Sequence, residues 1–461
     1  MDMGISLDGL SSGLDTTSLI TQLMTAEAAP QNLLKTQVTT SNTVISALQG
    51  LNTRMATLAD SAAAAAKVGS LDLHSATSSS TTLTVAVSTG ARAGDLQVVV
   101  SALAQSQVGV SAAMAAWPSP STITIVGHSD TPLEITPSSN SLDDVALAIN
   151  GSTAGVTATK VASGVDSSGN KLYRLQFSSK TSGVDSSFRI YQGAAADRSE
   201  ANDVLMASGS AMIKTAQNAR VTLWKGTSAE QVITSATNTF TDLLPGVSVT
   251  ASAVFADPVT IAVTRDDTKI CAVVKGLVDS ISSAFVLIAA QTAVSTTTDA
   301  SGKSTTSAGV FAGDSNIRDI RQKTLDAASA PINGHSPSEY GIVLTRIGTI
   351  TFDPDKFAAA LLADPTTVMA AVQTIASRIA MIATAASDKY GGTLTNQITG
   401  DQGQVKSLGD QISAWDVRLA SRKSTLQRTY SAMEVLLSNM KAQSAALTSQ
   451  LSAFSTSTKT G

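Results

Sequence analysis

The segment Ser301-Gly302-Lys303-Ser304 has residue types that hold a nucleotide phosphate, because it matches the end of a P-loop motif. That motif also requires a glycine five residues before Gly302 and a buried strand leading into it. Thr297 stands at the position of that glycine, and residues 295–307 form a low-complexity run rich in Ser and Thr. The sequence therefore predicts a flexible loop here and not a phosphate-binding site.

Two carboxylates lie close together in Asp353-Pro354-Asp355, a spacing that suits general acid–base catalysis. The pair follows an expected strand and precedes an expected helix that begins near Lys356. Carboxylates at this position are typical helix caps. We therefore interpret the pair as a cap and not as a catalytic pair.

Metal-ligating and nucleophilic side chains are scattered. His74, His128 and His335 stand in different segments, and Cys271 has no ligand-type neighbour. A metal site needs several such residues together, so we expect no metal and no other cofactor. No nucleophile-elbow sequence is present, and we expect no enzyme activity. Cys271 is the only cysteine, which excludes an intramolecular disulfide, and its apolar neighbours indicate a small buried hydrophobic residue.

Composition narrows the class of protein. The 461 residues suffice for several domains, and 43% of them are hydrophobic while 14% are charged. The net charge of −4, without any basic cluster, gives no reason to expect nucleic acid or an anionic membrane as a partner.

Targeting signals are also missing from the sequence. The first basic residue is Lys35, and acidic residues precede it, so the N-terminus does not resemble a cleaved secretion signal. The most apolar stretch, residues 270–290, is interrupted by Lys275, Gly276 and Asp279. We expect no membrane insertion.

Both ends of the chain carry heptad patterns, in which apolar residues alternate at spacings of three and four. The N-terminal heptads run from residue 34 to Ala65, and their larger apolar members are Leu34, Val44, Leu48, Leu51, Met55 and Leu58. The C-terminal heptads run from residue 405 to Phe454 and include Leu408, Ile412, Trp415, Leu419, Leu426, Met433, Leu436, Met440 and Leu447. Such long heptad runs predict helices that pair as a coiled coil or helical bundle. An amphipathic helix packed on its own domain is the alternative.

The middle of the chain has the alternation typical of strands. One set is expected at residues 82–87, 95–100, 221–224, 247–254 and 259–263. A second set, at 123–126, 133–136, 156–161 and 172–177, begins after Trp117-Pro118-Ser119-Pro120 and contains a short helix capped by Ser141. Helices return from Asp267, with a hairpin expected around Ile347-Gly348 and a helix beginning at Asp364-Pro365. The fold class is therefore α+β and multidomain, with strand-rich domains inserted between paired terminal helices.

Several segments resemble flagellar filament-capping proteins, the FliD or hook-associated protein 2 family. They are residues 10–20 (LSSGLDTTSLI), 141–158 with Ile149-Asn150 as the "IN" motif of flagellar axial proteins, 311–318 (FAGDSNIR) and 348–353 (GTITFD). Each segment is short, but they occur in the family's order over nearly the whole chain.

This resemblance implies a division of the chain into a flexible export and axial segment (1–33), a helical leg (34–72 and 267–404) and a C-terminal coiled-coil helix (405–461). Between them it implies a strand-rich plate domain (73–118 and 221–266) and an inserted outer domain (119–220). It further implies a secreted protein at the distal tip of the flagellum, which forms a homo-oligomeric ring, retains exported flagellin and promotes its polymerisation. The other partners that the resemblance implies are the flagellar type III export apparatus and a cytoplasmic export chaperone. A flagellin, a hook–filament junction protein and a surface adhesin are the alternatives.

Overall fold

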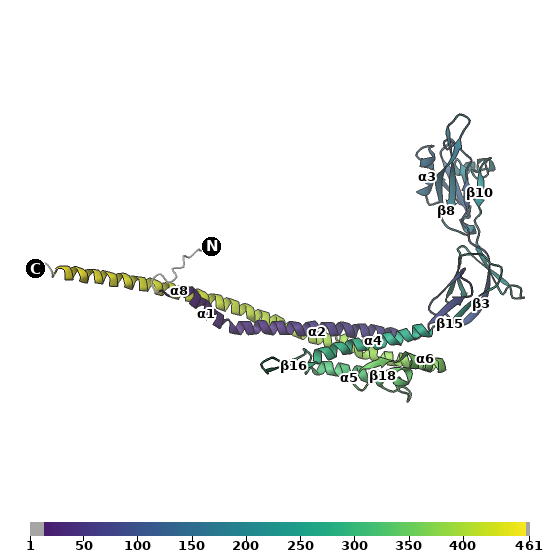
Figure 1. Cartoon of the computed structure of the whole chain (residues 1–461). Coiled ribbons are helices and arrows are strands. Elements are labelled where there is room, and N and C mark those ends of the chain that lie inside the picture. The colour runs from purple at the N-terminus through teal and green to yellow at the C-terminus, as the bar shows by residue number, and fades with distance from the viewer. Residues whose placement is uncertain (1–12, 458–461) are drawn as a thin grey trace. The chain divides into compact units, whose positions relative to one another are not determined.

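The computed structural model describes residues 13–457, with side chains described as far as Ser452, and it divides into a helical unit and a strand-rich unit (Figure 1). The strand-rich unit is one continuous stretch, Gly69–Ile270. The helical unit combines the residues up to Val68 with those from Cys271 onwards. The chain therefore has the α+β organisation that the sequence predicts, with the strands inserted between terminal helices.

The helical unit also contains two short hairpins. Among the residues that the structure describes, its helices are α1 (Thr16–Glu27), α2 (Ala29–Ala66), α4 (Asp267–Thr292), α5 (Ser315–Ser329), α6 (Pro354–Ala363), α7 (Pro365–Ser387) and α8 (Thr393–Ser457). The hairpins pair β16 (Val294–Thr298) with β17 (Ser304–Ala308), and β18 (Ile342–Leu344) with β19 (Ile350–Phe352). The second hairpin and the helix from Pro365 confirm the sequence prediction.

Aspartate side chains cap several of these helices, because the first N–H groups of a helix have no partner within it. Asp15, Asp314, Asp353 and Asp364 accept hydrogen bonds from the N–H groups of Ser18, Asn316, Lys356 and Thr367 at 2.8, 2.8, 3.0 and 3.0 Å. The caps predicted at Asp353 and Asp364 are confirmed.

The core of the helical unit lies along α2. This helix packs against α7 and α8, and Arg54 Nη1 donates to the Ser283 carbonyl of α4 at 2.9 Å. The fully buried side chains include Leu48, Leu51, Met55 and Leu58 of α2, Val274, Leu277 and Ile281 of α4, and Val372, Ile375 and Ile379 of α7. Burial of these side chains is the main stabilising contribution to the unit.

Two helices of this core, α4 and α7, are long and apolar enough to span a membrane by length and composition alone. From the sequence we expected the interruptions in residues 270–290 to leave no apolar stretch of membrane-spanning length, and by this measure that expectation is wrong. Their apolar faces are buried in the helical core, which is the reason for their composition.

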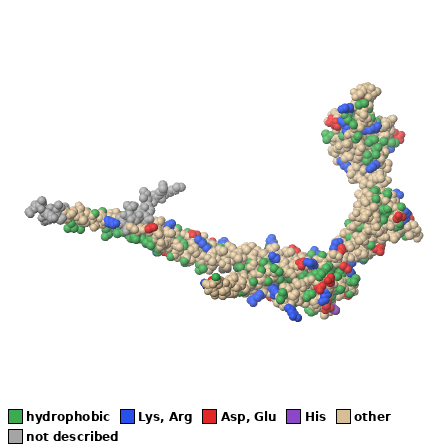
Figure 2. Space-filling view, viewed as in Figure 1, with side chains coloured by type: hydrophobic (Ala, Val, Ile, Leu, Met, Phe, Trp, Pro, Cys, Tyr) green, Lys and Arg blue, Asp and Glu red, His purple; other side chains and the backbone are tan. Residues whose placement is uncertain are grey.

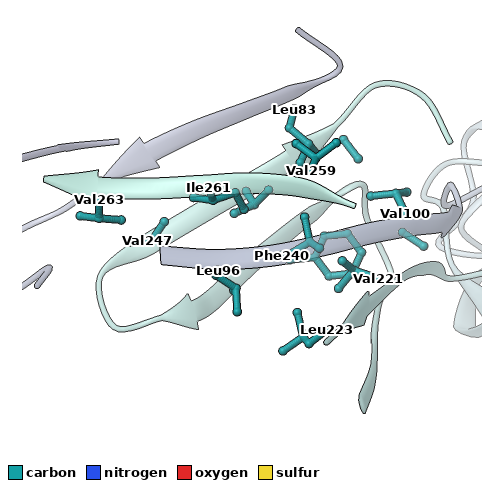
Figure 3. Close-up of a cluster of buried hydrophobic side chains, with 14 of the residues drawn as sticks. Leu83, Leu96, Val100, Val221, Leu223, Phe240, Val247, Val259, Ile261 and Val263 are labelled. Carbon is teal, nitrogen blue, oxygen red and sulfur yellow. The ribbon is translucent and has the colours of Figure 1, made fainter. Parts of the chain in front are cut away.

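The first part of the strand-rich unit has two antiparallel sheets. One sheet has the order β1 (His74–Ser78), β15 (Val259–Arg265), β3 (Gly94–Ala102), β11 (Ala219–Leu223), β12 (Gln231–Ser235). The other has the order β13 (Thr239–Leu244), β14 (Val247–Ala251), β2 (Leu83–Val87). Figure 3 shows Leu96, Val100, Phe240 and Ile261 among the buried side chains gathered between the strands. Alternate residues along each strand supply this core, as period-two patterning requires.

A second core lies within the residues between β3 and β11. A four-stranded sheet has the order β10 (Ala211–Lys214), β4 (Val108–Val110), β8 (Lys171–Ser179), β7 (Val156–Val165). A three-stranded sheet has the order β6 (Pro132–Ile135), β5 (Ile123–Gly127), β9 (Phe188–Gln192), and α3 (Leu142–Asn150) packs with β7. Trp117, Ile149 and Phe177 are buried in this core. Since β4 and Trp117 belong to it, this domain begins earlier than the expected residue 119.

Two sequence expectations need correction. Residues 1–33 are not a flexible segment throughout, because α1 begins at Thr16 behind the Asp15 cap. Residues 1–12 lie outside the described part. Residues 295–307 are not a flexible loop, because most of them form the β16–β17 hairpin. Thr favours strands, and pairs of Thr and Ser hydroxyls hydrogen-bond across the two strands.

Candidate assembly surface

In the described part of the chain, the residues that could carry chemistry have structural partners or lie apart from one another. Asp353 caps α6, and the Ser301–Lys303 segment forms the turn between β16 and β17, where the Asp299 carboxylate accepts the N–H groups of Ser301 and Lys303 at 2.9 and 3.0 Å. Over the part of the chain that the structure describes, no three His, Cys, Asp or Glu side chains lie close enough to bind a metal ion. Cys271 is half-buried in α4, and this burial raises the pKa of its thiol, which disfavours the reactive thiolate.

The two terminal helices lie against each other in antiparallel directions. Gln31 Nε2 near the start of α2 donates to the Asp416 Oδ1 atom of α8 at 2.5 Å. Further along α8, Arg422 Nε donates to Glu27 Oε1 of α1 at 3.1 Å. Because residue numbers fall on one side as they rise on the other, α8 runs back along α2 and then along α1.

The N-terminal heptad residues are buried to different extents. Leu48, Leu51, Met55 and Leu58 are 0–1% exposed, whereas Leu34 and Val44 are half-buried. At its C-terminal end α2 also contacts α7, since Gln373 Nε2 donates to the Lys67 carbonyl at 3.1 Å. The heptad face of α2 therefore belongs to a helical bundle and not to a two-helix coiled coil alone.

The C-terminal heptad residues are more exposed in the second half of α8 than in the first. Leu408 is buried, at 7% exposure. The next five predicted positions are half-buried: Ile412, Trp415, Leu419, Leu426 and Met433. Leu436, Met440 and Leu447 are 64%, 63% and 61% exposed. In the structure, the heptad residues in the first half of α8 are thus at least half-buried, whereas Leu436, Met440 and Leu447 in the second half are exposed to solvent.

We name the four exposed side chains Leu436, Met440, Leu447 and Leu451 the distal stripe. Leu451 is 64% exposed. Residues 435–457 contain a single charged residue, Lys441, and are otherwise apolar, small or amide- and hydroxyl-bearing. Figure 2 shows hydrophobic side chains along the exposed surface of α8. An apolar stripe on a nearly uncharged helix is typical of a surface that packs against another chain.

Sequence reasoning found these positions from their spacing, except for Leu451. Leu451 lies four residues after Leu447, whereas the predicted frame places its next member three residues on, at Gln450. Tyr430 and Leu437, which are half-buried, also lie four residues after a heptad member. The change of frame keeps the apolar residues on one face of a straight helix, because an ideal α-helix drifts relative to a strict seven-residue repeat. The spacing of four residues between Leu426 and Tyr430 was the sequence signal for this change, and a fixed heptad frame does not include it.

Comparisons with known proteins match this arrangement. The family model described as "Flagellar hook-associated protein 2 N-terminus" matches residues 12–107, and the model described as "Flagellar hook-associated protein 2 C-terminus" matches residues 216–442. A flagellar hook-associated protein 2 of Escherichia coli O157:H7 is 26% identical over 473 aligned residues, covering 97% of this chain and 98% of the relative. A B-type flagellar hook-associated protein 2 of Pseudomonas aeruginosa is 26% identical and covers 96% of this chain and 91% of its own.

A solved structure has the same fold. The crystal structure of the D1-D2-D3 domains of the flagellar cap protein FliD from Escherichia coli superposes with a TM-score of 0.59 at 22% sequence identity. The match covers 77% of this chain and 99% of the other.

Proposed function

Since this chain belongs to the flagellar hook-associated protein 2 family, we propose that it is the cap at the distal tip of a bacterial flagellar filament. The family match on both sides of the inserted second core, residues 12–107 and 216–442, is the observation that carries this proposal. The role is structural: subunits form a ring that prevents the loss of exported flagellin and promotes its insertion beneath the cap. The family match favours the cap over a flagellin, a hook–filament junction protein or an adhesin.

The helical ends anchor and assemble the cap. The buried heptad residues of α2 hold the leg together, whereas the distal stripe of α8 has an exposed face to offer to neighbouring subunits or to the filament. Burying apolar side chains of this size contributes about 1.5–3 kcal/mol each. A stripe of four such residues therefore supplies substantial association free energy once a partner helix covers it.

Export places two demands on the chain. A chain that passes unfolded through the flagellar type III apparatus to the outside of the cell benefits from having no disulfide, and Cys271 is the only cysteine. Before export the distal stripe would be open to water, and a cytoplasmic chaperone that binds α8 protects it from aggregation.

A deletion strain tests the cap function. In the bacterium that carries this gene, a strain lacking it is expected to retain hooks and to release flagellin into the medium as monomer. Electron microscopy and an immunoblot of the medium give the readout. Filaments of normal length in the deletion strain would exclude a cap function. Complementation with the intact gene is the control.

Truncation tests whether α8 is needed for assembly and whether the strand-rich unit folds without it. Removing residues 406–461 is expected to abolish assembly at the filament tip while the strand-rich unit, Gly69–Ile270, stays folded. Circular dichroism of the purified truncated chain measures the remaining strand content. Loss of the strand signal would show that the strand-rich unit depends on α8, and tip assembly by the truncated chain would show that α8 is not the assembly helix.

A further inference from the structure

The β16–β17 hairpin has no core of its own. All ten strand residues, Val294–Thr298 and Ser304–Ala308, are exposed. Among the described residues no third strand joins this two-stranded sheet. An isolated two-stranded hairpin is only marginally stable in water. The fold therefore maintains a protruding hairpin that gains little from packing within its own chain.

The ladder pattern shows which main-chain groups are unpaired. Gly309 donates its N–H to Ala293 at 2.8 Å, and Asp299 donates to Lys303 at 3.0 Å. Hydrogen-bonded pairs alternate with non-hydrogen-bonded pairs in an antiparallel ladder. The residues of the non-hydrogen-bonded pairs therefore direct their N–H and C=O groups outward. They are Val294, Thr296 and Thr298 on one edge, and Ser304, Thr306 and Ala308 on the other.

The side chains agree with this assignment. The Thr296 and Thr306 hydroxyls lie 3.3 Å apart, and the Thr298 and Ser304 hydroxyls lie 2.9 Å apart. Side chains approach more closely in non-hydrogen-bonded pairs, which are the pairs whose main-chain groups face outward.

Neither edge carries the features that keep strands apart. Proteins protect free edges with Lys, Pro, bulges or a covering element. Here both strands lack charged residues and proline, and the register runs without a bulge. The nearest charges, Asp299 and Lys303, lie in the turn. Two unprotected edges on a hairpin without a core indicate that these edges pair with further strands.

We propose that the hairpin joins neighbouring copies of this chain, with the β16 edge of one copy pairing with the β17 edge of the next. Because β16 and β17 are antiparallel, equivalent hairpins side by side continue one antiparallel sheet. Three outward residues on each edge give about six hydrogen bonds per junction. The two edges differ, so the contact is head-to-tail, the type that closes into a ring. The inference rests on the ring assembly of the proposed function and assigns one of its contacts.

Disulfide trapping tests the junction. In a Cys271→Ala background, one preparation carries Thr296→Cys and a second carries Thr306→Cys. The two sites face each other across the proposed junction at about 5.5 Å between Cα atoms, within disulfide range. Under mild oxidation the mixture is expected to give a covalent dimer, while each preparation alone stays largely uncrosslinked. Equal crosslinking in a single preparation would overturn the head-to-tail arrangement.

Proline substitution tests the edge itself. Thr296→Pro removes an outward N–H and leaves the main-chain bonds within the hairpin intact, although it also removes the hydroxyl that lies near Thr306. It is expected to weaken self-association at least tenfold in analytical ultracentrifugation without changing the Tm of the monomer. Thr296→Val keeps the N–H and serves as the matched control. An oligomer that persists in Thr296→Pro, with no crosslink in the mixture, would overturn the hairpin contact and leave the cap function intact, whereas failure of the wild-type chain to oligomerise would count against ring assembly itself.

Discussion

The Asn150 side chain makes two hydrogen bonds to the main chain of Ala158. Nδ2 donates to the Ala158 carbonyl at 2.9 Å, and Oδ1 accepts the Ala158 N–H at 2.8 Å. Asn150 is the last residue of α3, and Ala158 lies in the edge strand β7. The amide therefore acts as a short strand segment that pairs with the sheet edge, while Ile149 is buried beside it. This pairing is a physical reason for an Ile-Asn motif at the end of a helix.

Asn150→Leu is expected to destabilise the second core by about 1–3 kcal/mol, because two main-chain groups lose their partner. Trp117 is buried in that core and reports its unfolding by fluorescence once Trp224 and Trp415 are replaced by Phe. Leu147→Ala, on the 71% exposed face of the same helix, is the control and should change stability by less than about 0.5 kcal/mol. Equal effects of the two substitutions would contradict the pairing role.

The Gln107 side chain pairs with the main chain of β9 in the same way. Its Nε2 donates to the Phe188 carbonyl at 2.6 Å, and its Oε1 accepts the Phe188 N–H at 3.1 Å, with 5% of the residue exposed. Gln107→Met keeps the volume and removes both bonds, so we expect a loss of about 1–3 kcal/mol in urea unfolding. Gln192→Met removes a single exposed amide bond to the Ser119 carbonyl and should cost much less. A neutral Gln107→Met would mean that water replaces the amide.

Sequence patterning predicted several strands that have a buried face, but it missed β9, in which Phe188 and Ile190 are buried. Val259–Val263 alternates between buried and half-exposed residues, and its prediction is confirmed by β15. β10 and β12 were not predicted, because their residues are mostly exposed and leave no alternation of apolar and polar types. The side-chain pairing of Asn150 with Ala158 was also beyond the sequence, since local patterns do not reveal which edge strand an amide reaches.

On the assembly surface, too, the sequence predicted some features and left others open. Heptad spacing gave the positions on α8, but it does not specify the partner of each turn. Leu408 is buried within the chain and Leu447 is 61% exposed, although both are leucines in the same repeat. The difference comes from which helices of the chain lie against each part of α8, which is a property of the tertiary structure.

A matched pair of leucine substitutions separates folding from assembly. Leu48→Ala, at a fully buried site, is expected to cost about 2–5 kcal/mol of unfolding free energy. Leu447→Ala, on the distal stripe, should change monomer stability by less than about 0.5 kcal/mol and weaken assembly. Thermal unfolding and sedimentation of each variant give the two readouts. Unchanged assembly in a Leu447→Ala, Met440→Ala double variant would argue against the distal stripe as a contact.

The cap of α7 makes part of the stability depend on pH. Hydrogen bonding to the Thr367 side chain, and then to its N–H, holds the pKa of the Asp364 carboxyl below its usual value. A carboxyl with a lowered folded-state pKa adds stability above its unfolded-state pKa, about 3.9, and that contribution is lost as the pH falls through the folded-state pKa. Asp364→Asn keeps the cap acceptor without the charge. The urea midpoints of the two proteins should therefore differ at pH 7 and converge below about pH 4. A difference that stays constant over this range would show that the charge plays no part.

Gly341 combines a left-handed backbone with close packing. Its φ is +75°, and a Cβ at this position would collide with the Asp353 carbonyl oxygen and lie 3.2 Å from the Phe357 side chain. Gly341 ends the short 3₁₀ turn Pro337–Tyr340 and begins the β18–β19 hairpin, and its carbonyl accepts the Asp353 N–H at 2.8 Å. Gly341→Ala is therefore expected to cost about 2–5 kcal/mol from backbone strain and overpacking together. Gly313→Ala has a similar φ of +88° and open space around the new methyl group, so it measures the backbone cost alone, about 1–2 kcal/mol. Chemical unfolding monitored by far-UV circular dichroism compares the two, and equal losses would show that the Asp353 carbonyl moves aside at no cost.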